Sequence, residues 1–275
     1  MEEQKLQSDL AFQYLKKKVI AKGLNCTGYK DDFLRRRFDG RMNVKGISSY
    51  AEYAHFLDRN PTECKELLDA LTINVSEFFR DPTVWKTFQA TIMPLIIKEK
   101  MQAFQRELRI WSAGCADGEE PYTIAISVID ALSYNLKAFR IEIVATDLDP
   151  QSLDRARAGV YSPARLRLVN HSVLHRFFRP LEGGNLRISD EVRKLVTFQS
   201  HDLFALPPSS PFDMISCRNV MIYFSRELQQ TLFRNFYQAL SPGGYLILGK
   251  VESPVGEYGT SFKCVDMRER IYQKT

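Results

Sequence analysis

Two glycines and two glutamates lie close together in the stretch RIWSAGCADGEEPYTI and could bind a cofactor. A strand that turns through Gly114 and Gly118 into a helix lets the backbone approach a nucleotide-like ligand closely. Glu119 and Glu120 open that helix, where an anion would otherwise be attracted, and no Lys-Ser/Thr pair follows the second glycine. The chemistry therefore favours a cofactor with an ammonium and a sulfonium over a phosphate. An ordinary tight strand-to-helix turn is the alternative interpretation.

Further polar side chains follow the ends of other predicted strands. Asp147 ends the strand RIEIVAT, at the position where a Rossmann-like fold hydrogen-bonds ribose hydroxyls. Asp202 lies in the segment VTFQSHDLF, and Asn219 lies at the end of the strand predicted in FDMISCRNVMIYF. Because the carboxyl ends of parallel strands meet at one edge of a sheet, these side chains and the Gly114 turn are expected to converge on one pocket.

The segment LTINVSEFFR carries Asn74, Ser76 and Arg80 between apolar residues. This arrangement suits a linker that folds over a pocket, although polar caps are also common before helices. A helix is predicted next in DPTVWKTFQATIMPLI, with Asp81 as its N-cap and Pro82 at its first position.

The remaining segments predict an α/β fold. Residues 1–70 contain short amphipathic helices and indicate a small, basic all-α domain, and residues 71–90 form a connector that contributes to the pocket. Strands and helices alternate in residues 91–275, which predicts a Rossmann-like parallel sheet. At about 177–198 the pattern changes to alternating apolar and polar residues around a glycine turn, which predicts an inserted small antiparallel β subdomain.

Composition is typical of a soluble globular protein, with 44% hydrophobic and 26% charged residues in a chain of 275. The polar stretch MEEQKLQSDL is no secretory signal, and no uncharged apolar run reaches the roughly 18 residues of a transmembrane helix, so no membrane insertion is expected. Five cysteines without a CxxC pair fit reduced thiols in the cytoplasm. His171 and His175 lack the glutamate of an HExxH motif, so no metal is expected.

Basic residues are concentrated in the N-terminal domain of a chain whose net charge is +5. The predicted helix DDFLRRRFDGRM carries Arg35, Arg36, Arg37 and Arg41. Such a run favours an acidic partner, and a solvated helix face is the alternative.

Several motifs in order resemble the chemotaxis receptor methyltransferases (CheR), which use S-adenosylmethionine to methylate glutamates on chemoreceptors. The matching segments are NVSEFFRD, WSAGCADGEEPYTIAI, ATDLDPQSLDRARAGVY, FDMISCRNVMIYFSRELQQ and LSPGGYLILGKVES. The resemblance covers nearly the whole chain. It implies a class I methyltransferase fold, S-adenosylmethionine as cofactor and S-adenosylhomocysteine as product. It also implies protein-glutamate O-methyltransferase activity on the cytoplasmic methylation helices of chemoreceptors.

The resemblance implies roles for individual residues as well. Glu120, with Glu119 beside it, would hold the methionine ammonium, and Asp147 would bind the ribose. The full set of implied cofactor contacts is Asn74, Ser76, Arg80, Gly114, Glu119, Glu120, Asp147, Asp202, Leu203, Asn219 and Val220. Arg80 and Tyr223 would lie nearest the transferred methyl and act in catalysis. The implied substrate-binding residues are Arg35, Arg36, Arg37 and Arg41.

Three other functions stay open at this point. A nucleic-acid methyltransferase would grip phosphates with the basic domain, although RNVMIYF lacks an NPPY-like base-flipping motif and the N-terminal domain shows no aromatic stacking platform. The acceptor could be another acidic protein, or the chain could be a non-catalytic cofactor-binding signalling module. Since no long exposed apolar pattern is present, a monomer is expected.

Overall fold

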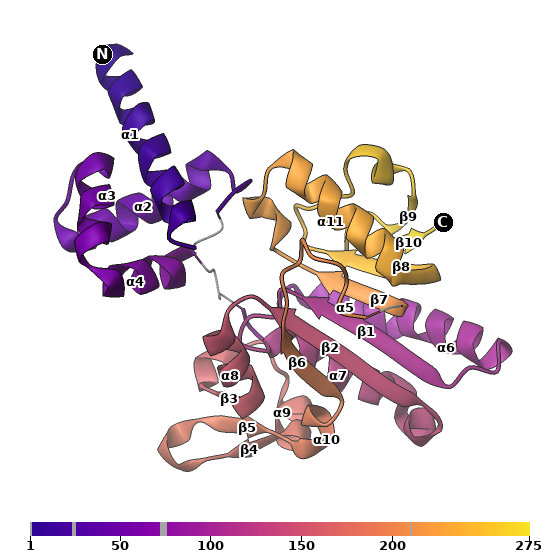
Figure 1. Ribbon diagram of the computed structural model, residues 1–275. Helices are drawn as coiled ribbons and strands as arrows, with labels where there is room; N and C mark the ends of the chain where they lie inside the picture. The colour runs from indigo at the N-terminus through magenta and orange to yellow at the C-terminus, as the bar shows by residue number, and fades with distance from the viewer. Residues whose placement is uncertain (1, 24–25, 72–75, 210) are drawn as a thin grey trace. The chain divides into compact units, whose positions relative to one another are not determined.

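The chain folds into two compact units, each with its own hydrophobic core (Figure 1). The first unit comprises Met1–Ile73 together with Tyr223–Leu228, and the second comprises Asn74–Ile222 together with Gln229–Thr275. The computed structural model describes residues 2–23, 26–71, 76–209 and 211–275.

The first unit is helical. Its helices are α1 (Glu2–Ala21), α2 (Asp31–Lys45), α3 (Tyr50–Arg59) and α4 (Pro61–Leu71). The side chains of Phe12, Leu15, Phe38, Tyr53 and Leu57 are buried where the apolar faces of these helices meet, as expected for residues at helical spacing. The predicted all-α N-terminal domain is confirmed.

The second unit is built on a mostly parallel sheet with the strand order β6-β2-β1-β7-β8-β10-β9. The first five strands in this order run parallel to one another, and β10 is antiparallel to both of its neighbours. The strands are β1 (Glu107–Ala113), β2 (Arg140–Asp147), β6 (Val196–Ser200), β7 (Phe212–Cys217), β8 (Leu240–Leu248), β9 (Phe262–Asp266) and β10 (Ile271–Lys274). This order and direction confirm the predicted Rossmann-like sheet.

Apolar side chains cover both faces of the sheet. Ile110 of β1 packs in the core that contains Trp85 and Ile124, whereas the next residue, Trp111, contacts Phe236 with the ring centroids 5.6 Å apart. Successive strand residues face opposite sides, so each face needs its own helical layer. The helices of this unit are α5 (Pro82–Thr87), α6 (Met93–Gln102), α7 (Glu119–Leu132), α8 (Pro150–Ala158), α9 (His171–Phe177), α10 (Asp190–Arg193) and α11 (Arg226–Ala239), whose first residues belong to the first unit. Short 3-10 turns lie at η2 (Ser133–Ala138), η3 (Pro163–Leu166), η4 (Glu182–Gly184), η5 (Met221–Tyr223) and η6 (Gly256–Gly259). No helix among the described residues is long and apolar enough to cross a membrane.

The small antiparallel sheet is present, but its boundaries differ from the predicted 177–198. Its order is β3-β5-β4, with β3 (Val160–Tyr161), β5 (Leu186–Ile188) and β4 (Phe178–Pro180). The segment EVRKLVTF was expected in the meander; it forms α10 and then β6, which pairs in parallel with β2. An alternating pattern indicates a strand with one buried face, but it fixes neither the partner nor the direction, which explains the error.

The helix predicted from Asp81 onward is interrupted. A π-helical segment, η1 (Phe88–Ile92), separates α5 from α6. Pro94, the second residue of α6, has no N–H to donate to the preceding turn, and such irregular turns accommodate a missing helical hydrogen bond. The interruption lies outside the site.

Candidate active site

The turn after β1 is held by backbone hydrogen bonds to the end of β2. The N–H groups of Gly114 and Cys115 both donate to the Thr146 carbonyl at 2.9 Å. Gly114 has a φ of 78°, and a Cβ there would lie 2.7 Å from a methyl carbon of Val220. The glycine is therefore required by packing against Val220, which brings together two of the residues expected to contact the cofactor.

Asp147 closes the cradle from the end of β2. One carboxylate oxygen accepts the Ala116 N–H at 2.8 Å and the other accepts the Asp149 N–H at 3.0 Å. Burial raises the pKa of Asp147 above its usual range. Asp149 caps α8 by accepting the Gln151 N–H at 2.9 Å, so capping does not occupy Asp147. Each Asp147 oxygen retains a lone pair that a ribose hydroxyl could use.

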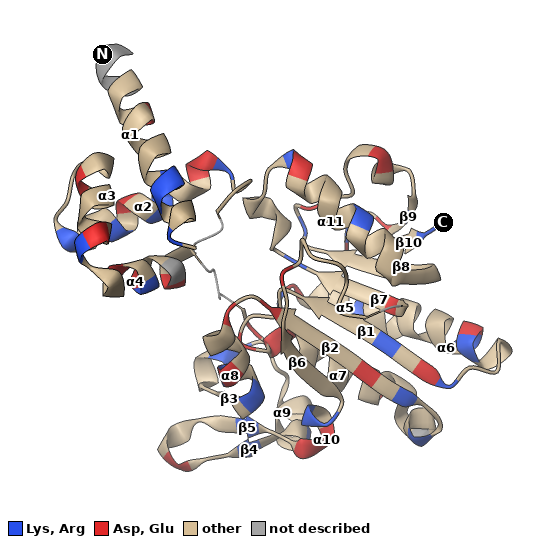
Figure 2. Cartoon of the chain, in the orientation of Figure 1, with Lys and Arg blue, Asp and Glu red and all other residues tan. Residues whose placement is uncertain are grey.

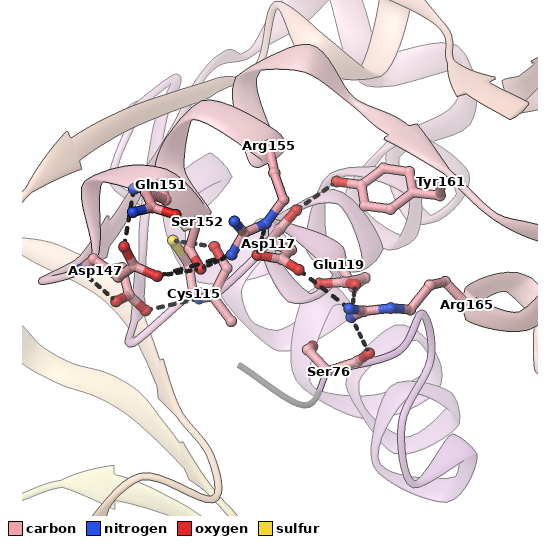
Figure 3. Close-up of polar contacts among 12 residues, drawn as sticks. Ser76, Cys115, Asp117, Glu119, Asp147, Gln151, Ser152, Arg155, Tyr161 and Arg165 are labelled. Carbon is pink, nitrogen blue, oxygen red and sulfur yellow. Dashed lines mark hydrogen bonds and ion pairs between the residues drawn. The ribbon is translucent and has the colours of Figure 1, made fainter. Parts of the chain in front are cut away.

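Glu119 lies at the start of α7 and is fully buried. Figure 3 shows its side chain beside Arg165 and Asp117. One carboxylate oxygen accepts a hydrogen bond from Arg165 at 2.6 Å, and the other has no hydrogen-bond partner among the described residues. Asp117 lies beside it and pairs with Arg155 at 2.9 Å and Arg165 at 3.2 Å. Burial dominates these contacts and raises the pKa of Glu119 to about 7.

Glu120, the next residue, has different surroundings. It accepts a hydrogen bond from the Ser112 hydroxyl at 2.9 Å, and its second oxygen lies 3.6 Å from a guanidinium nitrogen of Arg218. Its side chain is 13% exposed, whereas that of Glu119 is not exposed at all. Of the two carboxylates, Glu120 is therefore the more accessible to a cationic ligand.

The connector is attached to this cradle through its backbone. The Ser76 carbonyl accepts a hydrogen bond from Arg165 at 2.9 Å, and the Phe78 N–H donates to the Arg165 carbonyl at 3.3 Å. The Phe79 N–H donates to the Thr123 hydroxyl of α7 at 3.1 Å. Ser76 thus lies beside the cradle as expected, while Asn74 lies outside the described residues.

Asp81 occupies the predicted N-cap position of α5 with Pro82 first in the helix, but its side chain does not cap the helix. Asp81 has a φ of 56° and no side-chain capping hydrogen bond. Its carboxylate instead pairs with Arg218 at 2.6 Å, and a second Arg218 hydrogen bond reaches the Arg80 carbonyl at 3.0 Å. The buried Arg218 guanidinium binds the Asp81 carboxylate in place of the backbone N–H groups of the helix. Because Arg218 is distant in sequence, no local pattern indicates this contact.

The loop after β7 presents Asn219 and Val220. Asn219 has a φ of 61°, and its side-chain oxygen is buried without a partner among the described residues. Glu252 holds this loop, because it accepts the N–H groups of Asn219 at 2.9 Å and Met221 at 2.8 Å. The sequence motifs did not indicate Arg218 and Glu252 as residues that support the site. Their one distinguishing feature in the sequence is a charged side chain next to an apolar strand.

The loop after β6 reaches the same edge of the sheet. The His201 N–H donates to the Asp147 carbonyl at 3.1 Å, which brings the following Asp202 and Leu203 close to the end of β2. Asp202 accepts the Phe204 N–H at 2.9 Å, so its side chain shapes the loop. The strand-end residues converge as the topology predicts.

A cavity of about 810 Å³ lies at the opposite edge of the sheet, lined by Glu107, Asp213 and Ser241 near the amino ends of β1, β7 and β8. One of its charged residues, Lys100, pairs with Asp213 at 2.6 Å. Ligands of open parallel sheets bind beyond the carboxyl ends of the strands, so we place the candidate site at the cradle.

The remaining predicted residues belong to the first unit. The Tyr223 ring packs on Phe33 with the centroids 4.8 Å apart, and the Tyr223 carbonyl accepts the Lys30 N–H at 3.0 Å. Arg35 pairs with Asp9 at 2.8 Å.

The other three arginines differ in how strongly the unit holds them. Arg36 is exposed, and Arg37 lies over the Phe33 ring at 5.4 Å. Arg41 bonds Glu63 through two nitrogens, at 2.9 and 2.8 Å, and Glu63 is 2% exposed. Figure 2 shows acidic residues beside the basic ones on the helices of the first unit.

Comparisons with known proteins match both units of the chain. The family model described as "CheR methyltransferase, SAM binding domain" matches residues 74–271, and that described as "CheR methyltransferase, all-alpha domain" matches residues 12–72. The chain is 31% identical over 235 residues to the chemotaxis protein methyltransferase of Borreliella burgdorferi, covering 84% of this chain and 83% of that protein.

Two further similarities are more partial. An uncharacterized 104.1 kDa protein of Rhodobacter capsulatus is 33% identical over 91% of this chain, which spans only 26% of that protein. The solved structure of the glycopeptide N-methyltransferase MtfA aligns with a TM-score of 0.33 at 13% identity, over 57% of this chain and 52% of that one.

Proposed function

Because the chain belongs to the CheR methyltransferase family, we propose that it transfers the methyl group of S-adenosylmethionine to glutamate side chains of chemoreceptors, forming methyl esters. The observation that carries the proposal is the cradle of Glu119, Glu120 and Asp147, which lies inside the segment that matches the S-adenosylmethionine-binding family model. The other curated relatives named as chemotaxis protein methyltransferases include those of Salmonella typhimurium and Pseudomonas aeruginosa.

The residues of the cradle fit this cofactor. A partly exposed carboxylate, Glu120, can hold the methionine ammonium, and the Asp147 oxygens can accept ribose hydroxyls. One side-chain oxygen each of Glu119 and Asn219 has no hydrogen-bond partner within the described part of the chain and is left as an acceptor for further donors of the cofactor. When bound, S-adenosylmethionine supplies an electrophilic methyl group on a sulfonium sulfur.

The acceptor needs no strong general base. A glutamate is ionised near neutral pH and can attack the methyl in line, so this chain contributes positioning and exclusion of water. The opposite charges of carboxylate and sulfonium diminish in the transition state, and a dry site favours that change. We propose that Arg80 orients the incoming carboxylate; for Tyr223, a hydrogen bond near the reacting methyl is proposed on the family resemblance alone.

Acidic receptor helices are the proposed partner of the first unit. Arg36 is exposed and Arg37 is held only loosely over a ring, so these two are available to pair with carboxylates. Arg35 and Arg41 already pair with acids of the unit, and we propose that Arg41 chiefly fixes α2 to α4 through Glu63. We further propose that the protein acts in the cytoplasm and as a monomer.

The proposal is tested by incubating the protein with methyl-labelled S-adenosylmethionine and a chemoreceptor cytoplasmic fragment, then measuring the volatile methanol released by mild alkali. Alkali-labile label on the receptor establishes a carboxyl methyl ester. The Glu120→Gln variant is the matched control and should lose both label and S-adenosylhomocysteine binding. Binding of S-adenosylhomocysteine by the wild type without any label on the receptor would reject the acceptor and keep the cofactor site.

A further inference from the structure

We propose that Arg218 is a positioning residue that holds Arg80 of the connector against the cofactor cradle. It deepens the proposed function, because it rests on the proposed role of Arg80. Arg218 follows β7 directly, and its side chain is only 3% exposed.

The guanidinium of Arg218 joins three parts of the second unit. It donates to the Arg80 carbonyl at 3.0 Å and pairs with the Asp81 carboxylate at 2.6 Å, both on the connector. A different nitrogen lies 3.6 Å from the Glu120 carboxylate on α7. The planar group also lies over the Trp85 ring at 5.2 Å. One side chain thus links the connector to the residue that would hold the cofactor ammonium.

The arrangement of Arg218 and the backbone around Arg80 lowers the stability of the fold, which indicates a functional role. The Nε atom of Arg218 is buried without a hydrogen-bond partner among the described residues. Asp81 and the nearby Phe79 both adopt positive φ values, 56° and 54°, which side chains other than glycine rarely adopt. The strained backbone on both sides of Arg80 is held by the buried Arg218 guanidinium, and together they fix the backbone position from which the Arg80 side chain extends.

Lysine cannot replace this arginine. Its ammonium is a point charge, and it lacks the planar fork that bonds a carbonyl and a carboxylate together while stacking on a ring. Arg218→Lys should therefore keep a buried positive charge but lose the bond from residue 218 to the Arg80 carbonyl, which would keep only its hydrogen bond from the Trp85 indole N–H at 2.9 Å. Arg109 offers a matched control, since it also bonds a carboxylate (Glu142, 2.9 Å) and a carbonyl and lies over a ring, at the amino end of β1.

The test compares Arg218→Lys, Asp81→Asn and Arg109→Lys. Hydrogen exchange of the backbone amides at 79–82 and S-adenosylhomocysteine affinity are measured without any acceptor, and kcat and KM are measured with the receptor fragment. We expect Arg218→Lys to speed exchange at 79–82 and to lower kcat at least tenfold at saturating cofactor. Asp81→Asn should lower kcat by a smaller factor. The variant that combines Arg218→Lys and Asp81→Asn should lower kcat by less than the product of the two single-variant factors.

Arg109→Lys should lower thermal stability without changing the exchange at 79–82 or kcat. Unchanged exchange and kcat in both Arg218→Lys and Asp81→Asn would overturn the proposal, even if both variants melt earlier. Hydrogen exchange and S-adenosylhomocysteine affinity are measured without an acceptor. They therefore test whether Arg218 holds Arg80 even if the receptor fragment is never methylated.

Discussion

Glu119→Gln is expected to make the protein more stable than the wild type at neutral and higher pH. Burial raises the pKa of Glu119 from 4.5 to about 7 in the folded protein. Between these values the folded state keeps a proton that the unfolded chain has lost, so the free energy of unfolding falls as the pH rises. Above the folded pKa both states are ionised, and the penalty stays constant. Glutamine does not titrate and retains an oxygen that Arg165 can bond.

The size of the effect follows from the two pKa values. A rise from 4.5 to about 7 corresponds to about 3 kcal/mol at roughly 1.4 kcal/mol per pH unit. Urea denaturation can be measured over most of the pH interval between these two pKa values. The difference in unfolding free energy between the variant and the wild type should therefore grow by about 2–3 kcal/mol between roughly pH 5 and 8.

Urea denaturation at several pH values measures this difference. Both tryptophans of the chain, Trp85 and Trp111, are buried in the second unit, so their fluorescence reports on the unit that contains Glu119. Glu257→Gln removes an exposed carboxylate and controls for net charge. A difference between Glu119→Gln and the wild type that does not change with pH would show that Glu119 stays ionised in the folded state, and the reasoning from burial would be refuted.

Three further variants test other parts of the structure. Gly114→Ala should weaken S-adenosylhomocysteine binding, measured by titration calorimetry, because the new methyl would clash with Val220; Gly183→Ala, which has a similar φ of 81° and open space, should not. Arg41→Ala should lower the unfolding free energy in urea by about 2 kcal/mol, since the buried Glu63 carboxylate loses its two hydrogen bonds from Arg41 and keeps only Lys45 at 3.1 Å and the Tyr53 hydroxyl at 2.7 Å; a loss below about 1 kcal/mol would contradict the structural role of this arginine. Arg36→Glu should raise the KM for the receptor fragment and flatten its salt dependence while leaving cofactor affinity unchanged; unaltered receptor kinetics would remove it from the binding surface.

The sequence predicts the sheet and the strand-end residues well, because both follow from local patterns. Alternating strands and helices dictate a parallel sheet, and the topology then brings Gly114, Asp147, Asp202 and Asn219 to one edge. These inferences need only the order of elements along the chain. The glycine turn was predicted for the same reason, although the atom that approaches it in the protein is a Val220 methyl.

The side chains that hold the site together could not be predicted in this way. Glu252 bonds the backbone of Asn219, and Arg218 bonds Asp81, across long separations in sequence. Such partners become neighbours only after the sheet has formed, so no local spacing indicates them. The missing capping hydrogen bond of Asp81 has the same origin: the residue stands at the predicted N-cap position, but its carboxylate pairs with Arg218 instead of the helix backbone.

Glu119 and Glu120 show most clearly what sequence identity leaves undecided. Consecutive helical residues point about 100° apart, so one glutamate enters the core near Arg165 and the other lies near Ser112 and Arg218. Burial favours the protonated form of the first, whereas the second is hydrogen-bonded and partly exposed. The pair therefore does not present two equal negative charges to a ligand. We therefore propose that the accessible carboxylate, Glu120, pairs with the single ammonium of the cofactor, while the buried Glu119 keeps its hydrogen bond to Arg165.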